Sequence, residues 1–180
     1  MALLKYNLYA LVLVFISRYL AIPMDHFNSD IGNYLWLPMG AVILSYLVFG
    51  PRVFLGAFLG YLLAEMVIEG GVVYITQSEV MSRFVNTLLP LLAIMLFKAV
   101  NLSDFIQRGK LNYRLLLPLV VVASFLTTLT KTILLYAPEQ FSAGKVYFQS
   151  YLIGDIIGGV VFIVLVFTLL RSSLQNQKIL

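Results

Sequence analysis

The chain has 180 residues, of which 61% are hydrophobic and 11% are charged. Soluble domains are about half apolar and about a quarter charged, so this composition excludes a water-soluble domain and favours a protein solvated by lipid. The net charge of +4 comes from basic residues placed between apolar runs, not from a basic patch, and we expect no nucleic-acid partner. The chain has no cysteine and one histidine, which excludes thiol chemistry and leaves little scope for a metal site. We expect neither a metal nor a cofactor.

The apolar residues fall into six runs, each near the length of about 20 residues that a membrane-spanning helix needs. The first run is too long for the core of a cleaved signal peptide, so we interpret it as a retained helix. The third run is the weakest, because Glu65 and Glu69 lie at its end. Together the runs predict an all-α fold, a polytopic helix bundle forming one integral membrane domain over residues 1–180. The predicted spans are residues 3–22, 34–50, 52–69, 80–100, 114–136 and 147–170.

The basic residues predict the orientation of these spans, because cytoplasmic segments carry more lysine and arginine. With both termini in the cytoplasm, the inner side receives twice as many basic residues as the outer side. The inner residues are Lys5, Arg52, Lys98, Arg108, Lys110, Arg114, Arg171 and Lys178. The outer residues are Arg18, Arg83, Lys131 and Lys145.

Two pairs of glycines four residues apart predict close contacts between helices. Small residues allow helix backbones to approach each other in lipid, where the hydrophobic effect adds little to helix association. The pairs are Gly56 with Gly60 on the third span, and Gly154 with Gly158 on the sixth. We interpret both as packing features that carry no information about function.

Ionisable residues at membrane depth are costly and usually face a partner or a wet cavity. In the predicted orientation these residues lie in the outer half of five spans, which predicts a polar vestibule open to the outside. The candidate ligand-binding residues are Asp155, Lys131, Arg83, Glu65, Arg18, Asn86 and Tyr151. The alternative is a set of internal salt bridges, with Arg18 and Lys131 extending to the interface. For Asp155, which is deeper and flanked by glycines, we favour a functional role.

Other patterns give weaker signals. His26 follows Asp25 in the first outer loop, but one histidine with nearby acids is more typical of a solvated loop than of a metal site. No catalytic motif is present in the sequence, so we predict no catalytic residues and a protein that is not an enzyme.

Two stretches resemble a known family. The segment Trp36-Leu37-Pro38-Met39-Gly40, followed by Gly50-Pro51-Arg52 and Leu55-Gly56-Ala57-Phe58-Leu59-Gly60, resembles the bacterial membrane-associated sensor domain MASE1. Gly154-Asp155-Ile156-Ile157-Gly158 is similar to a late Gly-Asp-x-x-Gly signature of that family. In physical terms, Trp36 is predicted to anchor at the interface, Pro38 to start a helix and Gly40 to allow close packing.

The resemblance implies a multi-pass sensory module of the bacterial inner membrane. Family members are generally longer and usually precede a cyclase, phosphodiesterase or histidine kinase domain. No such domain follows Leu170, so the expectation is a short form that perceives a small ligand and signals through a separate membrane or signalling protein. Two alternatives remain open. One is a substrate-binding subunit of an energy-coupling-factor transporter, and the other is a structural or assembly subunit of a membrane complex.

Overall fold

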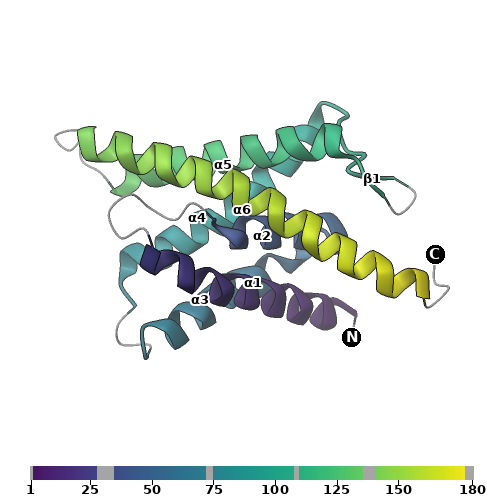
Figure 1. The fold of residues 1–180 in the computed structure, drawn as a ribbon, viewed down its shortest axis with the longest axis horizontal. Coiled ribbons are helices and arrows are strands. Elements are labelled where there is room, and N and C mark those ends of the chain that lie inside the picture. Colours follow the sequence, from purple (N-terminus) through teal and green to yellow (C-terminus); the bar gives the residue numbers. More distant parts are fainter. Residues whose placement is uncertain (1, 28–34, 72–74, 108–109, 136–140, 177–180) are drawn as a thin grey trace.

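The computed structural model describes residues 2–27, 35–71, 75–107, 110–135 and 141–176 (Figure 1). These residues form a bundle of α-helices, together with one short 3-10 helix and one pair of two-residue antiparallel strands. The elements in chain order are α1 (Ala2–Phe27), α2 (Leu37–Phe49), η1 (Pro51–Val53), α3 (Phe54–Ile68), α4 (Gln77–Ala99), β1 (Ile106–Gln107), β2 (Lys110–Leu111), α5 (Tyr113–Leu135) and α6 (Phe141–Asn176).

Five helical segments are long and apolar enough to cross a membrane: α1, η1 with α3, α4, α5 and α6. They confirm the predicted helices over residues 3–22, 52–69, 80–100, 114–136 and 147–170. Large apolar side chains such as Leu4, Leu55 and Ile133 point away from the bundle, as expected for surfaces that contact lipid. The chain is therefore a multi-pass helical bundle.

The second predicted span, over residues 34–50, is wrong in length. Helix α2 has 13 residues, or about 19 Å at 1.5 Å per residue, which is less than the ~30 Å hydrocarbon core of a bilayer. Every residue from Pro38 to Tyr46 is buried, and α2 lies at the centre of the bundle against α1, α4 and α6 (Figure 1). Its apolar composition therefore matches a protein core, not a lipid-facing span.

Helices α1 and α3 pack closely through the first glycine pair. A Cβ at Gly56 would collide with the backbone of Asn7, and a Cβ at Gly60 would lie 2.6 Å from the carbonyl oxygen of Leu11. The Asn7 side chain fastens this contact, since its Oδ1 accepts from the Gly56 N–H at 2.8 Å and its Nδ2 donates to the Arg52 carbonyl at 3.2 Å. The predicted packing role of Gly56 and Gly60 is confirmed.

The second glycine pair, on α6, receives the start of α2. A Cβ at Gly158 would collide with the backbone of Trp36, and the Trp36 N–H donates to the Gly154 carbonyl at 3.0 Å. Four residues after Trp36, a Cβ at Gly40 would collide with the Gly159 carbonyl. Pro38 lies in the first turn of α2, as predicted. These glycines therefore position the start of α2 inside the bundle.

The start of α1 and the end of α6 lie at the same end of the bundle, together with the β1–β2 pair (Figure 1). We call this the terminal end. The opposite end contains the end of α1, the end of α3, the start of α4, the end of α5 and the start of α6. These five helix ends carry the predicted ligand-binding residues, so the fold places those residues in one half of the molecule.

Candidate functional site

Glu65 on α3 holds two arginines from two other helices. Its Oε1 lies 2.8 Å from Nε of Arg18 on α1 and 2.8 Å from a terminal guanidinium nitrogen of Arg83 on α4. Its Oε2 accepts a longer bond of 3.5 Å from Arg18. The Glu65 and Arg18 side chains are 3% and 7% exposed. One carboxylate therefore balances two guanidinium groups in a nearly dry environment.

The indole ring of Trp36 lies beneath both guanidinium groups. The Cζ atoms of Arg18 and Arg83 are 4.9 and 5.5 Å from the ring centroid, within the roughly 6 Å range of a cation–π contact. Trp36 is 5% exposed, so the predicted interfacial anchor is wrong. The start of α2 packs against Gly154 and Gly158 of α6, and this contact places the indole ring inside the bundle. We call Arg18, Trp36, Glu65 and Arg83 the Glu65 cluster.

A second group lies between α5 and α6. Asp155 is 1% exposed, and its Oδ2 accepts from the Thr128 hydroxyl at 3.2 Å. Lys131 is 3% exposed, and its Nζ lies 5.0 Å from the ring centroid of Tyr151. Tyr151 stacks on Tyr147 at 4.1 Å. We call Thr128, Lys131, Tyr151 and Asp155 the Asp155 cluster.

Tyr61 joins the two clusters. Its side chain is fully buried on α3, one turn before Glu65, and it interacts electrostatically with Arg18, Arg83 and Asp155. Its hydroxyl makes no well-formed hydrogen bond, although the Trp36 indole lies near it. The two clusters thus form one polar region to which α1, α2, α3, α4, α5 and α6 all contribute.

This region carries more hydrogen-bonding capacity than its described residues use. Both polar atoms of the Asn86 side chain are buried without a partner, as is Oδ1 of Asp155. Among the described side chains, the two clusters contain three cations and two acids. Buried polar groups are normally paired, and unpaired ones within a membrane bundle are typical of a binding or transport site.

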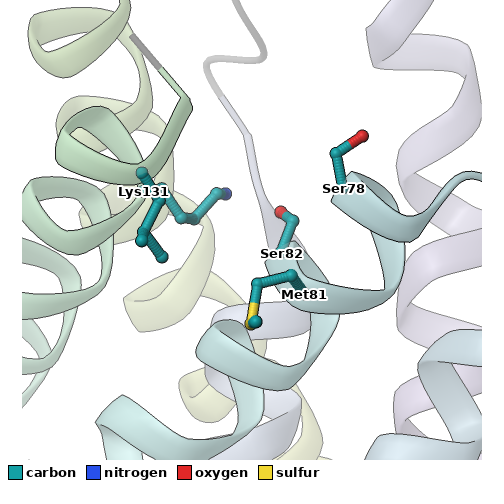
Figure 2. A pocket seen from close by; sticks show the side chains of 5 residues that line it. Ser78, Met81, Ser82 and Lys131 are labelled. Carbon is teal, nitrogen blue, oxygen red and sulfur yellow. The ribbon is translucent and has the colours of Figure 1, made fainter. Parts of the chain in front are cut away.

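A hollow of about 130 Å³ lies beside this region, between α4 and α5 (Figure 2). Its walls are Ser78, Met81 and Ser82 from α4, with Lys131 and Leu134 from α5. Figure 2 shows the Lys131 side chain extending from α5 towards Ser82. Among the predicted site residues in the described part of the chain, Lys131 is the one that lines this hollow.

The start of α4 is fixed by a reciprocal cap. The Thr76 N–H donates to Oε2 of Glu79 at 2.7 Å, and the Glu79 N–H donates to the Thr76 hydroxyl at 3.3 Å. Such a capping box satisfies two otherwise unpaired backbone donors. It sets where α4 begins and therefore where Ser78 and Ser82, one turn apart, meet the hollow.

The predicted site residues are thus brought together in space. Arg18, Glu65 and Arg83 are in direct contact, Lys131, Tyr151 and Asp155 are neighbours, and Asn86 is buried on α4 one turn after Ser82. The alternative of internal salt bridges holds for Glu65 and its two arginines. Its other part, in which Arg18 and Lys131 extend to the interface, is wrong because both are buried in protein. The side chains of Asp25 and His26 lie outside the described residues.

Sequence reasoning missed Trp36 and four residues that line the hollow. Trp36 was predicted at the interface, and no role was predicted for Ser78, Met81, Ser82 and Leu134. The weak signal for Ser78 and Ser82 was their i, i+4 spacing beside Glu79 and Arg83, which places hydroxyls and charges on adjoining faces of one helix. No signal in the sequence places Met81 at the hollow.

Comparisons with known proteins do not identify a relative. No protein-family model, curated protein or solved structure matches this chain.

Proposed function

We propose that this protein is a sensory or ligand-binding module of the bacterial inner membrane, not an enzyme, that takes a small ligand from the extracytoplasmic side and signals through a separate partner. The observation that carries the proposal is the convergence of five ionisable side chains, four of them buried, from five helices beside a hollow. Such a cluster is costly to bury, and part of it has no partner among the described residues.

The size of the hollow supports a small ligand. Pockets that enclose drug-sized molecules measure about 300–1,000 Å³, whereas this hollow measures about 130 Å³. A vitamin-sized molecule would extend beyond this hollow.

The geometry of α6 supports transmission to the terminal end. With 36 residues from Phe141 to Asn176, α6 is about 54 Å long and ends at the terminal end (Figure 1). Asp155 is therefore on the same rigid helix that reaches the face where, in the proposed orientation, a cytoplasmic partner would bind. A ligand that changes the Asp155 cluster would shift α6 as a unit.

The test is gentle purification of the full chain followed by native mass spectrometry of bound small molecules. We expect a bound species in the wild type, lost in Asp155→Asn and retained in Asp104→Asn, whose exposed aspartate lies near the terminal end. All three proteins should insert and express equally. Equal ligand occupancy in the wild type and Asp155→Asn would contradict the proposal, as would a wild type that carries and binds no small molecule.

A further inference from the structure

Lys131 is a buried cation without a close ion-pair partner among the described residues. Within the described residues its ammonium group takes part in no hydrogen bond and in no ion pair of 4.0 Å or less, and its closest specific contact is the face of Tyr151. An ammonium carries three N–H donors, and Asp155 offsets its charge without forming a close ion pair or hydrogen bond with it. Lys131 is therefore suited to bind an acceptor that enters the hollow it lines.

Neither Asp155 nor Glu79, which follows Ser78 on α4, fills this role. Asp155 interacts with Lys131 electrostatically, but its Oδ2 accepts from Thr128 instead. Glu79 is held at the start of α4 by the N–H and hydroxyl of Thr76. One oxygen of each carboxylate is thus engaged elsewhere, and neither carboxylate lines the hollow.

The walls of the hollow specify the chemistry of its ligand. Lys131 supplies a positive charge, and Ser78 and Ser82 supply hydroxyl donors, so the polar side of the hollow matches an anion that accepts several hydrogen bonds. Met81 and Leu134 supply an apolar side, which matches a short alkyl group better than a fully hydrated inorganic ion. The volume corresponds to about four waters at ~30 Å³ each, which is close to the size of acetate or propionate.

We propose that the hollow between α4 and α5 binds the carboxylate of an organic acid, with Lys131 as the charged anchor and Ser82 as a hydroxyl donor to the carboxylate. This inference rests on the proposed ligand-binding function and names the ligand class. Two sources supply such a group: a free short-chain acid, or a fatty acid whose tail extends from the hollow between α4 and α5 into lipid.

The experiment is a thermal unfolding series on the full chain in detergent, followed by the emission of Trp36, the single tryptophan of the chain. Sodium acetate, propionate, butyrate, octanoate and laurate are compared with sodium chloride at equal ionic strength, below the critical micelle concentration of each acid. A ligand that binds the folded state raises the midpoint in a saturable manner. Stabilisation that peaks at acetate or propionate identifies a free short acid, and stabilisation that increases up to laurate identifies a fatty acid.

Matched variants assign the effect to the hollow. We expect Lys131→Met to weaken carboxylate binding by about tenfold or more, as for the loss of a charged hydrogen-bond donor, and Lys145→Met, at an exposed lysine of α6, to leave it unchanged. Ser82→Ala, which keeps the charge, should weaken binding less and serves if Lys131→Met fails to fold. The proposal is overturned if no acid stabilises the protein beyond chloride, or if both Lys131→Met and Ser82→Ala bind as the wild type does. If a different ligand co-purifies and depends on Asp155 while no carboxylate binds, this inference fails and the proposed function stands.

Discussion

Among substitutions that preserve side-chain size in the polar region, Glu65→Gln should lower the stability of the folded protein the most. The substitution preserves size and removes the one negative charge that faces both Arg18 and Arg83, each 2.8 Å away. Removing one partner of a buried ion pair costs about 3–5 kcal/mol, because the other charge is left buried without compensation. Arg83 loses its carboxylate and Arg18 loses one of its contacts, so we expect a loss within that range.

The assay is reversible unfolding in mixed micelles of increasing denaturing detergent, with Trp36 emission as the signal. Because the Trp36 ring touches both guanidinium groups, it reports on the Glu65 cluster directly. The control is Glu69→Gln, at the exposed glutamate that follows the end of α3, which should change stability by at most about 0.5 kcal/mol.

A double-mutant cycle tests the reasoning more closely. Adding Arg83→Gln to Glu65→Gln removes a cation that the first substitution deprives of its carboxylate, so the double variant should lose less stability than the sum of the two single variants. A Glu65→Gln protein within about 1 kcal/mol of the wild type would refute the reasoning, as would strictly additive losses in the cycle. Either result would mean that water or lipid headgroups screen the arginines.

Two further substitutions test how the helices are positioned. Gly158→Ala places a methyl group against the Trp36 backbone, which cannot move as a flexible side chain does. We therefore expect a loss of stability of about 1–3 kcal/mol and a shifted Trp36 emission maximum. Unchanged stability and emission would contradict this contact. Asn7→Ala removes the side-chain hydrogen bonds to Gly56 and Arg52 and should lower the stability by about 1–2 kcal/mol in the same unfolding assay. Unchanged stability would show that α1 and α3 associate through glycine packing alone.

The long spans could be predicted from composition because a run of about 20 apolar residues has few alternatives to a transmembrane helix. The same rule led to the second predicted span, over residues 34–50, which is longer than helix α2. A sequence such as Pro38–Tyr46 is equally apolar whether it faces lipid or protein, and hydropathy does not distinguish the two. Only the contacts with α1, α4 and α6 show that α2 belongs to the core.

The candidate site was predictable as a set of residues but not as a geometry. Charges at membrane depth are rare enough that Arg18, Glu65, Arg83, Lys131 and Asp155 could be assigned to one polar region. Which of them would pair depends on the rotation of each helix, which the sequence leaves open. Trp36 shows the limit most clearly, because a tryptophan at the start of an apolar run is typical of an interface, and here the close approach of α2 to Gly158 carries it inside.

The central claim is that the polar region is reached through the hollow from the extracytoplasmic side. Because the chain has no cysteine, a single Ser82→Cys substitution gives an unambiguous probe at the wall of the hollow, with Lys98→Cys at the other end of α4 as its matched control. In right-side-out vesicles we predict that a membrane-impermeant thiol reagent labels Ser82→Cys from outside and labels Lys98→Cys only after permeabilisation. Labelling of Ser82→Cys only after permeabilisation, or of Lys98→Cys from outside, would contradict the account.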